Sequence, residues 1–478
     1  MLYPSEAAAD AKHARQMDGF GKPASDSDND SGEETLESQL DERFSEPFYT
    51  GLWAGISFVL SVLVLWNMLM EFVLFEKPER CLTGNAARHE YWPMYTSIFT
   101  IVLWAECWSL LLFVWTSIGC DYRKILNIRI DEKNSYVRFA AKLVIMVSLG
   151  RWVFNKSQQC KPPFDRLVDT AAYQPLILCF CIAAYVVHRF GCAIPRLILA
   201  AVASPFAAAG VTALDAYVGD VLTSLVKPLM WIAYIGCFYG TGELTRPDEF
   251  CEEYTFHSDS PLSIGTLTLL FPNVLRIAQT LRQYYDTGNK HPFLTNTGKY
   301  LCSLAITLYG LFHRSRQNEI TQSHGLAGYW LYIAAMCVAT LYSFLWDITM
   351  DWNLFTSSGT CLCIPYKNVR MRKRRLLGGL RPYIAASAAD FVLRFFYIRN
   401  FVPHGSFSFG QKVLDTCSFF APELEIFRRT MWSVLKMETE QLKADDKAAA
   451  AAAASLGGPG PRVDAKAMED AQPLVTMK

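Results

Sequence analysis

The chain has 478 residues, with 45 basic and 45 acidic side chains and therefore a formal net charge of zero. Its hydrophobic fraction of 51% is too high for an ordinary soluble protein, and its balanced charge predicts no nucleic-acid partner. The 14 cysteines and 8 histidines never cluster at metal-ligand spacing, so we expect neither a metal site nor a cofactor.

Both ends of the chain are poor in apolar periodicity. Residues 1–47 hold 12 acidic against 4 basic side chains, including the run SDSDNDSGEE, which predicts a disordered acidic tail in the cytosol. Residues 441–478 contain an alanine run followed by Gly and Pro. This composition predicts a second disordered cytosolic tail.

Long apolar runs fill the chain between the two tails. The first, from Leu52 to Met70, has no charge and is long enough to cross a bilayer. Ten such runs predict an all-α, polytopic membrane protein that lies in a lipid bilayer. The ten segments are 52–70, 95–118, 136–154, 173–190, 225–240, 262–281, 300–312, 326–346, 382–398 and 412–436. The run 197–214 is long enough for an eleventh, but Pro205 also suits a broken or surface-lying helix.

The loops predict the orientation of these helices. The basic loop YKNVRMRKRRLLGGLR at 366–381 is expected in the cytosol, because short cytosolic loops collect Lys and Arg. The acidic loop ELTRPDEFCEEYTFHSD at 243–259 is expected on the outer or lumenal side. Ten spans and a cytosolic N-terminus satisfy both expectations and place the C-terminus in the cytosol.

Ionisable side chains interrupt the apolar runs in the second half of the chain. A charge near the bilayer centre costs about 2.5 to 3.5 kcal/mol on insertion scales, so a group of them predicts a shared polar cavity. The candidates are Asp220, Arg276, Lys299, Asp347, Asp390, Arg394, Glu425, Arg428 and Arg429. Arg276, Asp390 and the nearby Asp351 also suit purely structural ion pairs.

The adjacent Arg428 and Arg429 are the most informative of these residues. Glu425 precedes them by one helical turn and is expected to steady one guanidinium while the other stays free. Arginine keeps its charge when buried and forms paired hydrogen bonds with tetrahedral oxyanions. Clustered arginines therefore indicate a phosphate-like anion.

Four stretches, in this order, resemble the EXS family: RIAQTLRQYYDTGNKHPFLTNTGKY (276–300), FLWDITMDWNLF (344–355), FVLRFF (391–396) and ELEIFRRTMW (423–432). That family is named after a yeast ER-retention protein, a retrovirus receptor and a yeast G-protein suppressor, and it includes plant phosphate exporters. The resemblance implies a ten-helix exporter of inorganic phosphate with an EXS-type fold, N-terminal helices at 48–214 and a transport core at 215–440.

The resemblance also implies a set of phosphate-binding residues. Family members use an aspartate of a D-Q-L-N-S-L-like segment, the Lys-Tyr of G-K-Y, the first aspartate of W-D-x-x-M-D-W, the arginine of L-R-F and the two arginines of F-R-R. In this sequence those positions are Asp220, Lys299, Tyr300, Asp347, Arg394, Arg428 and Arg429. Thr223 replaces the usual asparagine, and Tyr397 is the aromatic residue near a position where tryptophan is usual. Glu425 and Arg276 are expected to support the site.

The resemblance further suggests where the protein acts. Large exporters of the family begin with an SPX domain, whereas here an acidic tail precedes the first span, so the chain resembles the SPX-less type of the yeast Golgi. We therefore expect a multi-pass Golgi protein that returns lumenal phosphate to the cytosol, with the plasma membrane as the alternative. Some relatives carry cysteines at Cys237 and Cys251, which suggests a disulfide in the lumenal loop.

Two other functions compete with phosphate export. A Golgi sorting or retention factor that acts by protein contacts is one alternative. A membrane enzyme that holds magnesium on Asp347 and Asp351 is the other, but the sequence lacks a second aspartate-rich motif. We expect no enzyme and no catalytic residue, and the sequence leaves open whether two copies form a homodimer.

Overall fold

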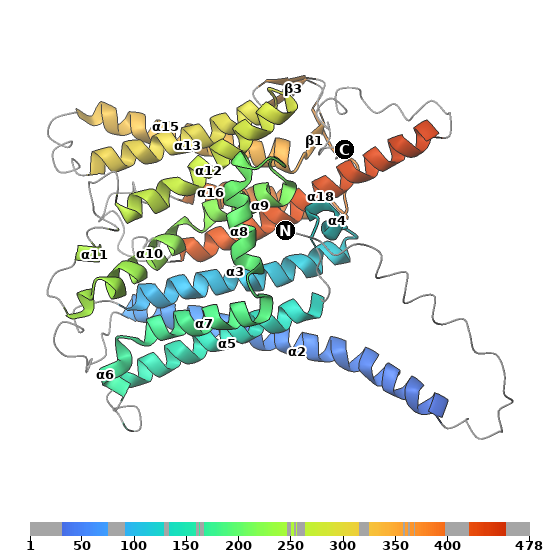
Figure 1. Ribbon diagram of the computed structural model, residues 1–478. Coiled ribbons are helices and arrows are strands. Elements are labelled where there is room, and N and C mark those ends of the chain that lie inside the picture. Colours follow the sequence, from blue (N-terminus) through green and yellow to red (C-terminus); the bar gives the residue numbers. More distant parts are fainter. Residues whose placement is uncertain are drawn as a thin grey trace, which may run out of the picture. The chain divides into compact units, whose positions relative to one another are not determined.

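The computed structural model is helical over most of its described residues and has two short sheets (Figure 1). The chain divides into two units, residues 1–52 and residues 53–478. The described part of the first unit, residues 31–52, is helical. The residues that the structure describes are 31–74, 91–128, 133–158, 162, 167–245, 250–252, 255, 263–314, 325–356, 359–361, 364–367, 369–396 and 420–455.

The elements follow one another in a simple chain order. The helices are α2 (Ser31–Leu74), α3 (Trp92–Ser117), α4 (Tyr122–Leu126), α5 (Lys133–Ser157), α6 (Val168–Ala171), α7 (Gln174–Phe190), α8 (Ala193–Ala203), η4 (Ser204–Phe206), α9 (Ala213–Ser224), α10 (Val226–Gly240), η5 (Glu243–Thr245), α11 (Phe250–Glu252), α12 (Ile264–Thr287), α13 (Phe293–Arg314), α15 (Gly325–Trp346), the π-helical η7 (Asp347–Asp351), α16 (Arg381–Arg394) and α18 (Ala421–Ser455). The strands are β1 (Phe355–Thr356), β2 (Gly359–Cys361), β3 (Ile364–Lys367) and β4 (Arg370–Met371).

Each of the ten segments expected to span a membrane overlaps a helix in the described residues, and residues 397–398 and 412–419 of the last two segments lie outside them. Within the described residues, three helical segments are long and apolar enough to cross a membrane, at Pro47–Met70, Pro93–Ser117 and Trp330–Asp351. The bent pairs α7 with α8 and α9 with α10 raise this number to five if each pair is one span. The fold class predicted from the sequence, an all-α membrane protein, is confirmed, and the four strands belong to the loop between η7 and α16.

Both expected tails are partly helical, which corrects the sequence prediction. Helix α2 begins at Ser31 within the predicted tail 1–47, and α18 continues to Ser455 within the predicted tail 441–478. Extending an existing helix avoids the unfavourable nucleation step. The run of alanines near the end of α18 also has the highest helix propensity of any residue type.

The stretch 197–214 does not form one helix. Helix α8 ends at Ala203, and Pro205 lies in the short turn η4, because a proline ring disfavours continuation of an α-helix. Helix α9 then begins with a capping box, in which Thr212 accepts from the Asp215 amide and the Asp215 side chain accepts from the Thr212 amide. Helix α8 is bent by 90° from α7 and crosses the neighbouring long helices (Figure 1).

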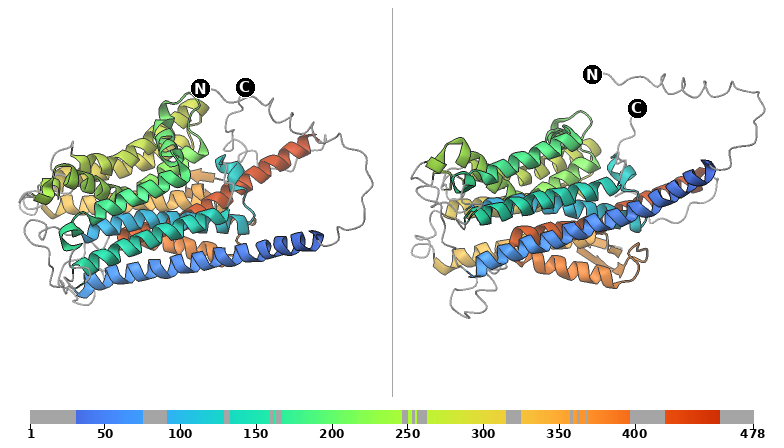
Figure 2. Two further views of the ribbon diagram at one scale, coloured as in Figure 1. Left: turned by 60° about the horizontal axis from the view of Figure 1, so that its bottom comes forward. Right: turned by 90° about the horizontal axis from the view of Figure 1, so that it is seen from below.

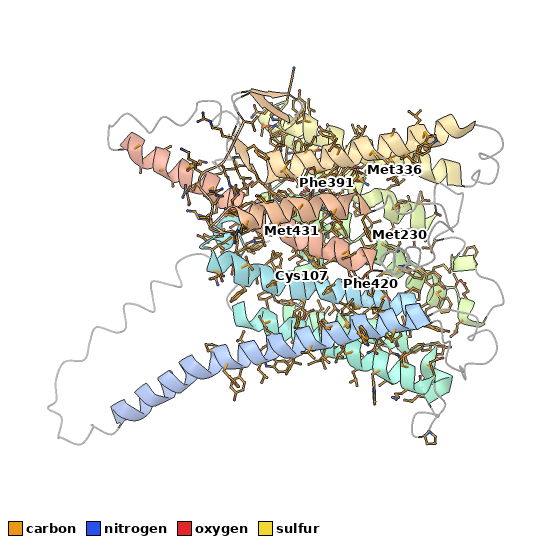
Figure 3. All side chains as sticks on the ribbon, turned by 180° about the vertical axis from the view of Figure 1, so that it is seen from behind. Cys107, Met230, Met336, Phe391, Phe420 and Met431 are labelled. Carbon is orange, nitrogen blue, oxygen red and sulfur yellow. A yellow bond between two sulfur atoms is a disulfide. The ribbon has the colours of Figure 1, made fainter. Side chains whose placement is uncertain are left out.

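Helix α3 is a central packing element of the second unit. It contacts α5, α10 and α18, and the views in Figure 2 show these helices side by side. Buried side chains between α2, α3, α5 and α18 include Val64, Phe99, Val144 and Ile426. From behind, Cys107 on α3 lies close to α18, the helix that carries Met431 (Figure 3).

A second group of helices, α9, α12, α13, α15 and α16, packs together and against α10 and α18. Helix α12 packs against α9, α10 and α13, and α16 packs against α15 and α18. A disulfide joins Cys237 of α10 to Cys251 of α11, which confirms the pairing suggested for the acidic loop. Between η7 and α16, β1 pairs with β4 and β2 pairs with β3, both antiparallel.

Gly219 allows α9 to approach α12 closely. A Cβ atom at this position would lie 2.5 Å from Oε1 of Gln279 and 2.7 Å from Cδ of Arg276. We expect Gly219→Ala to destabilise the protein by about 1 to 3 kcal/mol through overpacking. Thermal unfolding of the purified protein in detergent measures this effect.

The matched control is Gly236→Ala on α10, where an added Cβ meets no atom within 4 Å. Alanine is favoured over glycine in a helix by about 0.5 to 1 kcal/mol, so this variant is expected to unfold at the same or a higher temperature. Equal unfolding temperatures for the two variants would contradict a close α9–α12 contact at Gly219.

Candidate functional site

A cavity of about 410 Å³ lies among the helices of the second unit. Side chains of α9, α12, α13, α15, α16, α18 and η7 line it. Its charged lining residues are Asp220, Lys299, Asp347, Asp351, Arg394, Glu425, Arg428 and Arg429. Four are acidic and four are basic, so the lining alone is electrically balanced, and the distribution of ion pairs decides what the cavity attracts.

A break between two helices forms one wall of the cavity. Asp220 and Thr223 lie in the last turn of α9, and the chain then bends by 72° into α10. The Thr223 hydroxyl donates to the Asp220 carbonyl oxygen at 2.7 Å. Broken helices direct polar groups of helix ends into the interior of a membrane protein, where ions and polar substrates are bound.

A π-helical segment forms another part of the lining. Asp347 and Asp351 are the first and last residues of η7, and the Trp352 amide donates to the Asp347 carbonyl at 2.8 Å, which closes a turn one residue wider than an α-helical turn. Such segments are rare and are frequent at functional sites. Both carboxylates of η7 line the cavity.

Arg394 and Arg428 are held by shared carboxylates. Arg394 pairs with Asp347 and places its Nε 3.0 Å from Oδ2 of Asp390. Arg428 places its Nη1 2.9 Å from Oδ1 of the same Asp390. Because Asp347 and Asp390 are 1% and 0% exposed, these pairs offset the cost of burying four charges.

Glu425 pairs with Arg428, as their spacing predicts. Nε of Arg428 donates to one carboxylate oxygen at 2.8 Å, and Nη2 donates to the other at 2.7 Å. This two-pronged geometry is the strongest form of an arginine–carboxylate contact. The third nitrogen, Nη1, donates to Asp390. All three guanidinium nitrogens of Arg428 therefore contact carboxylates.

Asp220 is also occupied by its neighbours. Arg276 places its Nε 2.9 Å from Oδ1 of Asp220, and the Tyr300 hydroxyl donates to the same oxygen at 2.6 Å. Nη1 of Arg276 donates to Oε1 of Gln279 at 2.7 Å. Arg276 does not line the cavity, so it supports the site from behind, whereas Asp220 and Tyr300 face the cavity.

Arg429 is held in a different way from Arg428. Its Nε donates to the Ser224 hydroxyl at 2.8 Å, and its Nη2 donates to the Thr223 hydroxyl at 3.1 Å. Its guanidinium carbon lies 4.7 Å from the centre of the Trp432 ring. In the described part of the chain Arg429 forms no ion pair, so its charge is available to an anion.

Lys299 is the second such cation. Its Nζ lies 4.5 Å from the centre of the Tyr300 ring and 5.2 Å from that of Trp346, both of which provide cation–π contacts. It forms no ion pair with any residue that the structure describes. Lys299 and Arg429 are thus two lining cations that an anion can bind, in a cavity whose lining is balanced overall.

Asp351 connects η7 to α18 in the cavity lining. Lys436 places its Nζ 3.1 Å from Oδ1 of Asp351, and Nε1 of Trp432 donates to Oδ2 at 3.2 Å. Both Asp351 and Trp432 line the cavity. Asp351 is therefore part of a structural ion pair, and Asp347 and Asp351 each have a cation partner, Arg394 and Lys436 respectively.

The structure brings almost all the residues predicted from the sequence into this one cavity. The predicted residues that line it are Asp220, Thr223, Lys299, Tyr300, Asp347, Arg394, Glu425, Arg428 and Arg429. Arg276 lies behind the lining and contacts Asp220. Tyr397 lies outside the described residues.

Sequence reasoning missed several polar neighbours of these residues. Ser303 and Ser343 line the cavity, four residues after Lys299 and four residues before Asp347 respectively. Residues four apart share one face of a helix, so this spacing was the available signal. Ser224 gave no signal of its own, because only the contact between α9 and α18 brings it beside Arg429.

Comparison with known proteins identifies related sequences. The sequence pattern described as the EXS family matches residues 91–442. The chain is 28% identical over 263 residues to Solute carrier family 53 member 1 of Cricetulus griseus, which is 52% of this chain and 35% of that protein. It is 31% identical over 230 residues to Protein SYG1 homolog of Schizosaccharomyces pombe, which is 48% of this chain and 30% of that protein. The matches span about a third of the length of these relatives.

The unequal surroundings of the two adjacent arginines lead to a stability prediction. Arg428→Ala leaves Glu425 without its cation partner and leaves the buried Asp390 with Arg394 alone. Breaking a buried pair in this way costs about 3 to 5 kcal/mol. Arg429→Ala removes contacts with two neutral hydroxyl groups and the Trp432 ring, and it leaves no carboxylate unpaired. We expect the first variant to lose most of its folded yield and the second to lose little.

Size-exclusion profiles and thermal unfolding in detergent compare the two variants. The control for Arg428→Ala is the double variant with Glu425→Gln. This second change removes the carboxylate that lost its cation partner, and it should restore part of the folded yield. Equal stability of the two single variants would show that the ion pairs of Arg428 do not support the fold.

Proposed function

This chain belongs to the EXS family, and from this premise we propose that it carries inorganic phosphate across a membrane through the cavity of the second unit. The observation that supports the proposal most directly is the pair of cations, Lys299 and Arg429, which line the cavity without a carboxylate partner among the described residues. An unpaired cation inside a membrane protein is costly and typically marks an ion pathway.

Phosphate matches these two cations chemically. It is a tetrahedral anion, and the planar guanidinium of Arg429 can donate to two of its oxygens, while the Lys299 ammonium provides a point charge. Ser303 and Ser343 extend the polar lining beside Lys299 and Asp347. We assign first contact with phosphate to Lys299 and Arg429.

The other predicted binding residues have supporting roles in this proposal. Arg394 and Arg428 are neutralised by Asp347, Asp390 and Glu425, so they add hydrogen-bond donors with little net charge. This pairing keeps the cavity from being a bare cluster of positive charge.

Carboxylates in the cavity lining give a basis for selectivity. Near neutral pH phosphate retains a proton that sulfate lacks, so a carboxylate such as Asp347 can accept a hydrogen bond from phosphate. The same carboxylate repels sulfate, which has no proton to donate. The proposal therefore includes preference for phosphate and arsenate over sulfate.

The test is phosphate flux in liposomes that contain only the purified full-length protein. We expect Arg429→Ala and Lys299→Gln to reduce flux per folded molecule about ten- to a hundredfold, since a charge-assisted hydrogen bond contributes about 1.5 to 3 kcal/mol. Arg429→Lys should also transport poorly, because the charge remains but the planar fork is lost. Arsenate should compete with phosphate and sulfate should not.

Arg374→Ala is the matched control, since Arg374 is 54% exposed and pairs with Asp445 and Asp446 away from the cavity lining. It should transport phosphate like the wild type. Absence of flux by the wild type would overturn the proposal and favour the alternative, a sorting factor that acts by protein contacts.

We also propose the direction of transport, from the Golgi lumen to the cytosol. The basic loop at 366–381 supports a cytosolic position for the part of the cavity lined by Asp351, because the chain runs from η7 into that loop through residues 352–365. Tags inserted at residues 20 and 470 should then both be accessible from the cytosol of selectively permeabilised cells. Accessibility of only one tag from the cytosol would contradict ten spans with two cytosolic ends.

A further inference from the structure

Two adjacent arginines of α18 differ sharply in their partners. Arg428 contacts two carboxylates directly, Glu425 and Asp390, whereas both hydrogen-bonded nitrogens of Arg429 contact neutral hydroxyl groups. Glu425 precedes Arg428 by three residues and Arg429 by four, and either spacing permits an ion pair on a helix. Helical spacing alone therefore does not explain why Glu425 pairs with Arg428 only.

Ser224 lies between the carboxylate of Glu425 and the guanidinium of Arg429. Its hydroxyl oxygen is 2.6 Å from Oε1 of Glu425 and 2.8 Å from Nε of Arg429. Ser224 is 5% exposed and is the last residue of α9, where the chain bends into α10. It does not line the cavity, so it acts on a ligand only through its neighbours.

The chemistry of a hydroxyl group fixes the direction of these two hydrogen bonds. Glu425 already accepts both donors of Arg428, which requires an ionised carboxylate that can only accept. The single hydrogen of Ser224 is thus donated to Glu425, and a lone pair of the same oxygen accepts from Nε of Arg429. The hydroxyl satisfies both groups while it separates the negative charge from Arg429.

From this arrangement we propose that Ser224 is a positioning residue that keeps Arg429 available to phosphate. Its hydroxyl holds the edge of the guanidinium and occupies the place where Glu425 would otherwise approach Arg429. Thr223 and the Trp432 ring fix the plane of the same guanidinium. This inference rests on the proposed function, because it explains how one arginine of the pair retains the charge that binds the anion.

A purely structural role of Ser224 leads to a different expectation. If the hydroxyl only satisfies buried groups at the end of α9, its loss lowers stability and leaves the affinity of the folded protein for phosphate unchanged. If it keeps Arg429 available, its loss lets Glu425 approach Arg429 and weakens phosphate binding in the folded protein. Affinity and stability therefore have to be measured on the same variants.

The experiment measures half-saturating phosphate for flux in liposomes and thermal unfolding in detergent, with and without phosphate. We expect Ser224→Ala to raise half-saturating phosphate about tenfold, with the maximal flux per folded molecule within about twofold of the wild type. Ser224→Thr keeps the hydroxyl and should restore the affinity. The matched control is Ser109→Ala, which removes a buried hydroxyl that donates to backbone carbonyls of Ala105 and Tyr136; its half-saturating phosphate should equal that of the wild type.

Double variants test the connection to Arg429 directly. Ser224→Ala should have no further effect on half-saturating phosphate in an Arg429→Gln protein, but it should keep its tenfold effect in a Lys299→Gln protein, because close partners are non-additive and independent sites are additive. An unchanged half-saturating phosphate in Ser224→Ala, or full additivity with Arg429→Gln, would overturn this inference and leave the proposed function in place. Absence of both flux and phosphate-dependent stabilisation in the wild type would overturn both.

Discussion

Charged side chains inside a bundle of apolar helices raise its free energy unless each finds a partner or an aqueous cavity. In the second unit one place that meets this requirement is the cluster in which Asp390 joins the guanidinium groups of Arg394 and Arg428. Asp347 and Glu425 complete the same cluster. The cluster links η7, α16 and α18. The ion pairs that neutralise the buried charges therefore also hold these three cavity-lining elements together.

Interrupted helices make this cluster possible. An uninterrupted α-helix satisfies its own backbone groups and offers only one side-chain stripe to its neighbours. Here the bend after Ser224 and the π-helical turn from Asp347 to Asp351 bring residues of helix ends to the centre of the unit. Gly219 lets α9 approach α12 closely enough for Arg276 to contact Asp220. The irregular helix ends therefore place the charged side chains where they can form ion pairs with one another.

Two of the four basic side chains that line the cavity form no ion pair with a carboxylate among the described residues. The carboxylates pair with Arg276, Arg394, Arg428 and Lys436, whereas Lys299 and Arg429 contact hydroxyl groups or aromatic rings within the described part of the chain. A cavity that is nearly balanced and has two accessible cations can attract an anion without holding it as tightly as an open cluster of arginines would. This balance suits a pathway through which an anion passes.

The sequence by itself determined the helical membrane class, the positions of the ten apolar segments and the charged residues that meet in the cavity, because hydropathy and charge are properties of single residues and short windows. It also indicated that Glu425 would hold one of the two arginines. Only the tertiary structure decided which one, because Ser224 reaches Arg429 across 205 residues of sequence. For the stretch 197–214 the sequence left open a spanning helix or a broken one, and in the structure α8 packs against α9 and η4 packs against α12. Pairing between distant segments depends on how helices are arranged in space, and no local pattern in the sequence contains that information.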